Sequence, residues 1–306
     1  MTLAFISHND CTVPYLGEQH PERPERLSAI EDQLIASNLE LALRRYDAPL
    51  ATREQLCRVH SKAYVKRIFS LDPRDEGVWL EPSTLMVRGS LAAARRAAGA
   101  AVLGVDLVMK AQARAVFCNV RPPGHHAERD TAMGFCIFNN IAVGAAHALQ
   151  VYGVERVAIM DFDAHHGNGT ESMFRNEPRV LYCSVFQHPF YPFRDIDMTS
   201  AQIVAVPLPA EAAGAEFRAA VEAQWLPRLD RFRPQLILVS AGFDAHVEDD
   251  LTDLRLVDSD FAWVSKIIFD CAERYADGRI VSTLEGGYAL PALGRSVAAH
   301  LNALLG

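Results

Sequence analysis

The chain has 306 residues, of which 50% are hydrophobic and 22% are charged, a composition typical of a globular protein with a large core. Its formal net charge is -8 and no stretch is rich in lysine and arginine, so neither nucleic acid nor an anionic membrane is expected as a partner. The N-terminus lacks the features of a signal peptide, no apolar run is long enough to span a membrane, and the six cysteines are scattered as in proteins of reducing compartments. Together these features predict a cytoplasmic location.

Short apolar runs alternate with amphipathic segments along the chain. We expect strands at residues 3–6, 115–120, 157–160, 179–185, 235–240 and 279–284. We expect helical segments at residues 27–39, 53–69, 90–110, 139–152, 216–232, 258–275 and 290–305. The segment 53–69 is expected to be broken at residues 59–61, and residues 71–82 are expected to form a loop. This alternation predicts an α/β fold with a largely parallel sheet covered on both faces, in a single domain over residues 1–306.

A cluster of ionisable residues follows the strand at 157–160. Asp161, Asp163, His165 and His166 lie at the carboxyl end of that strand, the edge of a parallel sheet at which ligands bind. Burying these groups without compensation would cost several kcal/mol per charge, whereas a bound cation would make the arrangement favourable. Asp163 and His165 are two residues apart, so in extended chain their side chains point the same way and can share one divalent metal.

Other strands also end in polar groups. His125 and His126 follow a stiff Pro-Pro-Gly turn, and Tyr288 follows a Gly-Gly pair that we expect to act as a flexible hinge. Ser184 lies at the end of the strand at 179–185, and Asp244 follows the strand at 235–240. Because the carboxyl ends of parallel strands lie at one edge of the sheet, we expect these side chains to share one site.

The combined set predicts metal-assisted hydrolysis of an unactivated carbonyl, with an amide as the favoured bond. A hydrolytic zinc site uses three protein ligands and leaves one position open for water. His125 and His126 are the available pair for proton transfer, and Tyr288 is placed to donate a hydrogen bond to the developing oxyanion. The predicted metal ligands are Asp163, His165 and Asp244.

Six segments carry a family resemblance, and they are residues 20–27, 121–127, 134–136, 161–169, 240–246 and 285–288. In this order they resemble the zinc-dependent histone-deacetylase-like amidohydrolases of the arginase/deacetylase superfamily, including bacterial class II-like deacetylases, acetylpolyamine amidohydrolases and acetoin-utilisation relatives. The resemblance implies a three-layer arginase/deacetylase fold, in which helices flank a central, mostly parallel sheet of about eight strands and the active site lies at the carboxyl ends of the strands.

The resemblance also implies individual catalytic roles and one Zn²⁺ per subunit on the three predicted ligands. His126 would be the general base and acid, and His125, oriented by Asp161, would be its electrostatic partner. Tyr288 would polarise the acyl oxygen. Asn168 stands where many relatives have an aspartate that orients the second histidine, so His126 should be less basic than with a carboxylate partner.

A substrate tunnel and a second ion are implied as well. Gly134, Phe135 and Tyr191 would line a narrow tunnel for an acetyl-lysine side chain or a small N-acetylated amine such as a polyamine, and Arg26 would lie near an inner cavity. A structural K⁺ is also implied. Its ligands would be main-chain oxygens of Asp161, Asp163 and His165, together with Ser184.

Departures from the family pattern at the mouth leave the substrate open. Ser83 stands near the position of an aspartate that grips the substrate backbone in protein deacetylases. Leu251 lies near the acidic gatekeeper of a polyamine-specific relative. Residues 248–250 could still form an acidic rim, and a solvated surface loop is an equally good interpretation of them. Protein acetyl-lysine, acetylpolyamines and other N-acyl amines all remain candidates, and a partner subunit could complete the mouth in a homo-oligomer.

Two other functions compete with deacetylation. A binuclear-manganese ureohydrolase of the arginase type shares the fold but needs further carboxylates, and Gly167 and His246 stand at those positions. A non-catalytic acyl-amine binding protein would keep the pocket and lose a ligand, a catalytic histidine or the tyrosine, all of which are present here. His166 is expected beside the metal ligands rather than among them.

Overall fold

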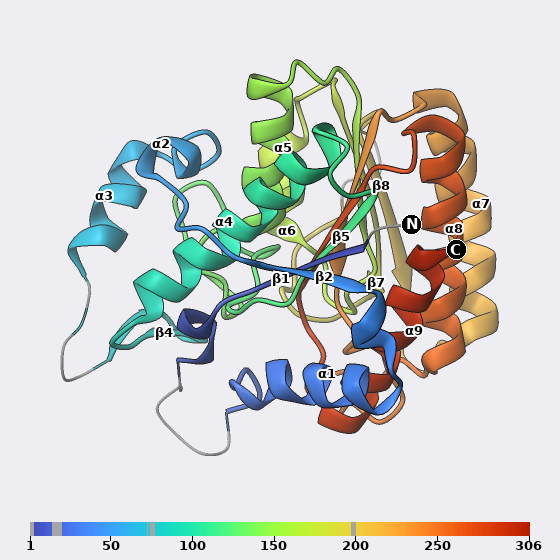
Figure 1. Cartoon of the computed structure of the whole chain (residues 1–306), viewed down its shortest axis with the longest axis horizontal. Coiled ribbons are helices and arrows are strands. Elements are labelled where there is room, and N and C mark those ends of the chain that lie inside the picture. Colours follow the sequence, from blue (N-terminus) through green and yellow to red (C-terminus); the bar gives the residue numbers. More distant parts are fainter. Residues whose placement is uncertain (1–2, 14–19, 72, 74–76, 197–199) are drawn as a thin grey trace.

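The computed structural model describes residues 3–13, 20–71, 73, 77–196 and 200–306, and a parallel sheet lies at its centre (Figure 1). Within these residues the sheet has eight strands, and each neighbouring pair is parallel. The predicted α/β fold is confirmed, and the six predicted strands are all present. In spatial order the strands are β2 (Leu43–Asp47), β1 (Leu3–Ser7), β5 (Ala115–Cys118), β10 (Ile280–Leu284), β9 (Leu236–Ala241), β6 (Val157–Asp161), β7 (Val180–Gln187) and β8 (Ile203–Leu208).

The two edge strands, β2 and β8, are absent from the sequence prediction. β2 carries Arg44, Arg45 and Asp47 and is partly exposed, so it lacks the continuous apolar run of a buried parallel strand. β8 contains Pro207, which is tolerated because an edge strand has one side without a hydrogen-bonded neighbour. Pairing with a neighbouring strand, rather than a local pattern, determines both.

Helices cover both faces of the sheet and give the three-layer arrangement (Figure 1). One face packs against α4 (Ser90–Met109), α5 (Asn140–Val151) and α6 (Asn168–Phe174). The other face packs against α7 (Gly214–Phe232), α8 (Asp258–Tyr275) and α9 (Leu290–Leu305), and α1 (Glu25–Ala36) packs on α9. The shorter α2 (Arg53–Leu56) and α3 (Lys62–Ser70) lie on either side of the break expected at residues 59–61, and 3-10 turns lie at Asn9–Thr12 and Leu39–Ala42.

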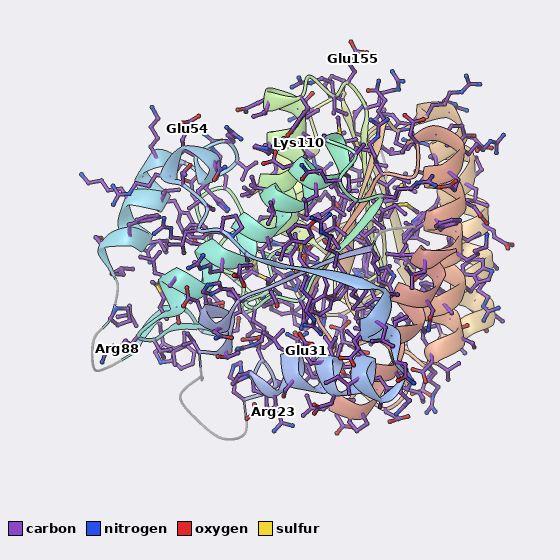
Figure 2. All side chains as sticks on the ribbon, in the orientation of Figure 1. Arg23, Glu31, Glu54, Arg88, Lys110 and Glu155 are labelled. Carbon is purple, nitrogen blue, oxygen red and sulfur yellow. The ribbon has the colours of Figure 1, made fainter. Side chains whose placement is uncertain are left out.

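Small residues let α4 lie directly on the sheet. A methyl group added at Gly104 would lie 2.7 Å from a γ-carbon of Val281 and 3.2 Å from one of Val116, so the helix backbone sits against the side chains of β10 and β5. Charged side chains instead project from the periphery, as the labelled Glu155 does at the top of Figure 2. None of the described helices combines the length and apolar character needed to cross a membrane.

A small hairpin stands where part of a loop was expected. The antiparallel strands β3 (Val78–Glu81) and β4 (Thr84–Met86) fall within or beside residues 71–82, so the prediction of a structureless segment is wrong for residues 78–81. Residues 72 and 74–76 of that segment lie outside the described residues. The hairpin matters because its turn carries Ser83 to the mouth of the site.

The ends of the central strands meet at one level of the sheet. Asp161 closes β6, and the register sets it between Ser184 on β7 and Ser240 on β9. Ser184 was expected at the end of its strand, but β7 continues to Gln187, so the serine lies within the strand and beside the end of β6.

Candidate metal centre and catalytic site

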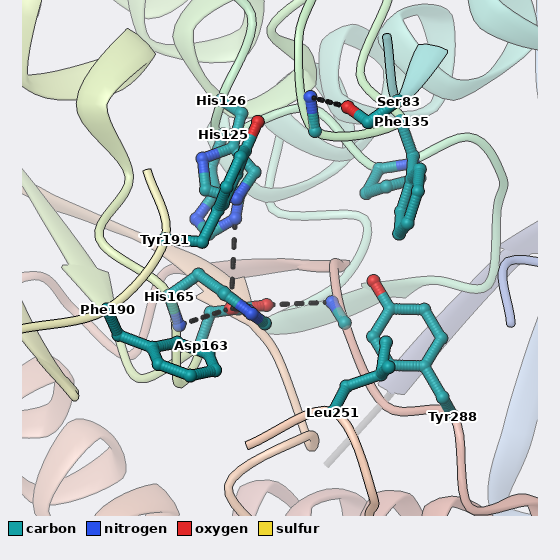
Figure 3. A pocket seen from close by; sticks show the side chains of 13 residues that line it. Ser83, His125, His126, Phe135, Asp163, His165, Phe190, Tyr191, Leu251 and Tyr288 are labelled. Carbon is teal, nitrogen blue, oxygen red and sulfur yellow. Dashed lines mark hydrogen bonds and ion pairs between the residues drawn. The ribbon is translucent and has the colours of Figure 1, made fainter. Parts of the chain in front are cut away.

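A cavity of about 210 Å³ opens at the carboxyl edge of the sheet. Figure 3 shows His125 and His126 facing Phe135 and Tyr288 across it, with His165 beneath. The wall is mostly apolar and the polar groups converge at its base, as is usual for a small-molecule site. The lining residues are Ser83, Pro123, His125, His126, Gly134, Phe135, Asp163, His165, Phe190, Tyr191, Leu251, Gly286 and Tyr288.

The three predicted metal ligands meet at the base of this cavity. Asp163, His165 and Asp244 each offer one ligand atom, and these atoms lie within 4.8 Å of one another. The Nδ1 atom of His165 is 3.2 Å from Oδ1 of Asp163 and 2.9 Å from Oδ2 of Asp244. The three side chains are therefore turned toward one point.

Main-chain N–H groups hold the two carboxylates in this orientation. Gly286 donates to Oδ2 of Asp163 at 2.8 Å, and Ala164 donates to Oδ1 of Asp244 at 2.9 Å. The other oxygen of each carboxylate is directed toward the His165 ring, and Oδ1 of Asp163 also accepts from the His165 main-chain N–H at 2.9 Å. Such outer partners are typical of metal ligands. Two buried carboxylates and one imidazole match the donor set of a zinc site.

The charges of this cluster are strongly coupled. Burial opposes ionisation of His165, but the Asp244 and Asp163 carboxylates raise its pKa to about 10. Burial, with Asp163 nearby, raises the pKa of Asp244 to about 6. A proton on His165 offsets one of the two negative charges at this short range, and a cation bound by the three side chains would take the place of that proton.

His125 is held by a carboxylate from β6. Its Nδ1 atom lies 3.1 Å from Oδ2 of Asp161, which also accepts a 2.8 Å hydrogen bond from the Tyr182 hydroxyl. Burial opposes its ionisation, but the Asp163 and Asp161 carboxylates raise the pKa of His125 to about 10. A protonated His125 fits the predicted role of an electrostatic partner.

His126 has the opposite electrostatic environment. Its Nδ1 atom lies 2.8 Å from Oδ1 of Asn168, an amide without charge. Burial and the neighbouring His125 and His165 rings lower the pKa of His126 well below its usual value. At neutral pH His126 is therefore neutral and able to accept a proton, which a general base requires.

Tyr288 faces these histidines from the loop after β10. Burial raises the pKa of its hydroxyl well above the usual value, so the group remains a hydrogen-bond donor. The expected hinge is tied down, because Gly286 donates to Asp163 and the Tyr288 N–H donates to Oδ2 of Asp249 at 2.6 Å. Hydrogen bonds thus hold Gly286 and the N–H that follows Gly287 in this structure, and the flexibility of the glycine pair stays a prediction.

Three predicted substrate residues line the cavity, and one does not. Gly134, Phe135 and Tyr191 are on its wall. Gly134 has a φ of 56°, and an added methyl group would lie 2.3 Å from the His126 ring, so a side chain there would displace the predicted base. Arg26 instead lies behind the wall, with its guanidinium 4.8 Å from the centre of the Tyr288 ring.

Buried Arg26 forms hydrogen bonds with the loop after β10. It donates to the main-chain oxygens of Gly287, at 2.6 Å, and of Glu285. It also pairs with buried Glu22 at 3.3 Å. Arg26 therefore supports the loop that carries Tyr288.

Of the three acidic residues considered for a rim, two are exposed and one is buried. Asp249 is buried and accepts main-chain hydrogen bonds from Tyr288, Ala289 and Leu251. Glu248 pairs with Arg295 at 2.6 Å, and Asp250 is exposed.

The structure brings together the four residues that are predicted to bind a monovalent cation. Asp161 and Ser184 are paired in register, and Asp163 and His165 follow in the same loop. Among the described residues, the Ser184 hydroxyl has no hydrogen-bonding partner in good geometry although it is fully buried. Such an oxygen is available to a cation.

Neither position that would distinguish a two-metal ureohydrolase adds a ligand. Gly167 packs against the Tyr182 hydroxyl and Asp161, and His246 stacks on Phe261 with its Nδ1 accepting from the Glu248 N–H. Within the described part of the chain, one cluster of three residues has metal-binding geometry. His166 contacts Glu171 at 2.7 Å and stays outside that cluster, as expected.

Sequence reasoning missed roles for Tyr182, Glu285 and Asp249. Tyr182 holds Asp161, and the Glu285 carboxylate accepts from the N–H groups of Gly124 and His125 at 2.6 and 3.1 Å. Glu285 stands in the segment 285–288 that carries the family resemblance, but the sequence assigns it no role. The partners of Tyr182 and Asp249 lie far away in the sequence, and no local pattern reveals them.

Comparisons with known proteins agree with this geometry. The histone deacetylase domain model matches residues 20–304. A histone deacetylase-like amidohydrolase of Pseudomonas aeruginosa is 38% identical over 90% of this chain and 74% of its own length. Human polyamine deacetylase HDAC10 is 35% identical over 100% of this chain and 48% of its own length, so the chain spans about half of that relative. The solved HDA15 HD domain has a TM-score of 0.90 at 28% identity, covering 100% of this chain and 90% of that one.

Proposed function

The chain belongs to the histone deacetylase family, and from that premise we propose that it is a zinc-dependent amidohydrolase that removes an acetyl group from an amine. Family membership supports deacetylase activity in general. The single observation that carries the specific proposal is the convergence of Asp163, His165 and Asp244 at the base of a cavity that also presents His126 and Tyr288.

Asp163, His165 and Asp244 would hold the metal. Zn²⁺ bound there would supply Lewis acidity toward an acyl oxygen and a more acidic water. Two carboxylates and one imidazole leave its coordination incomplete, as a hydrolytic site requires. The main-chain hydrogen bonds from Gly286 and Ala164 keep the ligand atoms in place for it.

The protein groups around the ligands would carry the proton transfers and bind the acyl group. His126, neutral and with Nδ1 engaged by Asn168, would take a proton from the attacking water at Nε2 and later deliver it to the leaving amine. His125, protonated beside Asp161, would favour the negative charge that develops at the acyl carbon's oxygen. The Tyr288 hydroxyl would donate a hydrogen bond to that same oxygen.

The apolar wall favours a substrate with a slender, uncharged chain between its acyl group and the rest of the molecule. Phe135, Phe190, Tyr191 and Leu251 present hydrocarbon to that chain, and a charge there would lose hydration without gaining a partner. The candidate substrates are acetyl-lysine side chains, acetylpolyamines and other small N-acyl amines.

We include K⁺ in the proposal as a structural ion near Ser184. The buried Ser184 hydroxyl, beside the end of β6, supports this choice. Bound K⁺ would stabilise the loop that carries Asp163 and His165, so thermal unfolding should shift upward in KCl relative to an equal concentration of a bulky organic cation. An equal melting temperature in both salts would remove K⁺ from the proposal.

The deciding experiment measures acetate released by the zinc-loaded protein from an acetyl-lysine peptide, an acetylpolyamine and a small N-acetyl amine. We expect turnover of at least one substrate, its loss on chelation and its return with zinc. His126→Ala should keep the metal and lose turnover by roughly 100-fold or more. A zinc-loaded protein that binds these amides without releasing acetate would instead be an acyl-amine binding protein.

A further inference from the structure

Behind the predicted general base, a row of polar groups runs from the cavity to the protein surface. The Nδ1 atom of His126 meets Oδ1 of Asn168 at 2.8 Å, and Nδ2 of Asn168 donates to Oε1 of Glu128 at 2.8 Å. Arg194 closes the row with a 3.0 Å contact to the same Glu128 oxygen. His126 and Asn168 are buried, whereas the side chains of Glu128 and Arg194 are 28% and 54% exposed.

The partners of the Asn168 amide determine which way it faces. Its nitrogen lies against three groups that accept hydrogen bonds, namely the Glu128 carboxylate at 2.8 Å, the main-chain oxygen of His126 at 3.3 Å and the Met133 sulfur at 3.2 Å. An ionised carboxylate accepts and does not donate, so it can face only the NH₂ end of the amide. Glu128 is both the closest of the three and the charged one, and hydrogen bonds to charged groups are the stronger kind.

The direction of the amide decides which nitrogen of His126 carries the proton. With its oxygen toward His126, Asn168 accepts from an Nδ1–H group, and the lone pair of neutral His126 is then at Nε2. If the amide were rotated by half a turn, its NH₂ group would face Nδ1 and favour the tautomer protonated at Nε2. That tautomer has no lone pair with which to accept a proton at Nε2.

We propose that Glu128 is a positioning residue for His126, acting through the Asn168 amide, and that its carboxylate is the reason an amide rather than a carboxylate serves at position 168. The proposal rests on the proposed hydrolytic function for its kinetic consequences. An aspartate at position 168 would place a second acceptor against the Glu128 oxygen, with no hydrogen between them. Arg194, which is largely exposed, supplies the opposite charge at the outer end of the row.

The test uses zinc-loaded protein and combines changes at positions 128 and 168. Glu128→Ala should lower kcat about tenfold with KM within about twofold, and Glu128→Gln, which retains an acceptor oxygen, should restore most of the loss. Asn168→Asp should also lower kcat. In that background Glu128→Gln should raise kcat about fivefold, because the glutamine NH₂ group can donate to the carboxylate introduced at position 168.

A matched control separates this coupling from a general effect of mutating a nearby acid. Glu171 is a buried glutamate on α6 whose carboxylate contacts His166 and Arg175, and within the described residues that carboxylate makes no hydrogen bond to Asn168. Glu171→Gln should change kcat by the same factor with asparagine or aspartate at position 168. The proposal would be overturned if Glu128→Gln changed kcat by the same factor with asparagine as with aspartate at position 168. It would also be overturned if Glu128→Ala left kcat unchanged.

A second measurement reads the tautomer without any substrate. In ¹⁵N NMR spectra of histidine-labelled protein, assigned with a His126 variant, the parent protein and Glu128→Gln should show His126 protonated at Nδ1. Glu128→Ala should show a mixture of tautomers, and an unchanged Nδ1–H signal would contradict the proposal. A change of tautomer in a protein that hydrolyses no N-acyl amine would support the role of Glu128 while refuting the proposed function.

Discussion

The carboxylate of Asp249 accepts a 2.6 Å hydrogen bond from the main-chain N–H of Tyr288, the residue predicted to polarise the substrate carbonyl. The same oxygen accepts from the next N–H, that of Ala289, at 3.1 Å, and the other oxygen accepts from Leu251 at 3.1 Å. One buried side chain in the loop after β9 therefore sets the position of Tyr288 and of a wall residue of the cavity.

Asp249→Ala is expected to lower kcat by about tenfold, because Tyr288 loses the contact that holds its backbone. Bound zinc should stay at one ion per chain. Asp250→Ala is the matched control, since its side chain is exposed in the same loop, and it should leave kcat within about twofold. Equal turnover in the two variants would show that Tyr288 is positioned by other contacts.

Tyr288→Phe is expected to lower kcat about 100-fold while the zinc content stays unchanged, because the variant removes one hydrogen-bond donor to the developing oxyanion and keeps the ring. Steady-state acetate release and metal analysis on the same sample check this. Unchanged turnover would remove the hydroxyl from the mechanism.

Asp163→Ala is expected to lose both metal and activity, because it removes a carboxylate whose oxygen faces His165 at 3.2 Å. Zinc per chain, measured after dialysis, should fall from about one to near zero, and turnover should fall with it. Asp250→Ala again serves as the control and should retain the metal. Activity in a metal-free preparation of either protein would contradict zinc dependence.

Leu251→Glu is expected to shift substrate preference toward acetylpolyamines, because it adds a carboxylate to an otherwise apolar wall that a polycation would contact. The ratio of kcat/KM for an acetylpolyamine to that for an acetyl-lysine peptide should rise about tenfold at low salt and less at high salt. Leu251→Gln, which is polar and uncharged, is the matched control. An equal ratio in the two variants would show that charge at this position does not select the substrate.

Acid should destabilise the fold through His300 in the core. His300 is fully buried between the Ser265 and Ser282 hydroxyls, and burial lowers its pKa to about 3. The unfolded chain binds this proton near pH 6.5 and the folded chain only near pH 3, so stability is lost as the pH falls through that window. Between pH 7.5 and 5 the loss amounts to about 2 kcal/mol.

His300→Gln retains a donor and an acceptor but does not titrate. Between pH 7.5 and pH 5 the unfolding free energy of this variant should therefore fall less than that of the parent protein, by a difference of about 2 kcal/mol. Urea unfolding of both proteins at pH 7.5 and pH 5, with equal zinc content, measures the difference. The same pH dependence in both would show that His300 is not the group responsible.

The amino-acid sequence by itself determined the fold class and the family. Six strands could be predicted because buried parallel strands are short apolar runs, and polar residues at the ends of five of them pointed to one edge of the sheet. The parallel α/β sheet and the histone deacetylase family are confirmed. The roles of the individual site residues remain predictions, although the structure brings most of them together around one cavity.

The tertiary structure alone decided which side chains support that site. Glu128, Tyr182 and Asp249 act on residues 21 to 40 positions away in the sequence, through hydrogen bonds that form only when the strand ends are assembled. The edge strands β2 and β8 likewise depend on pairing with a neighbour. Local patterns record burial and turn chemistry, whereas the direction of a buried hydrogen bond depends on a partner that the fold brings from elsewhere in the chain.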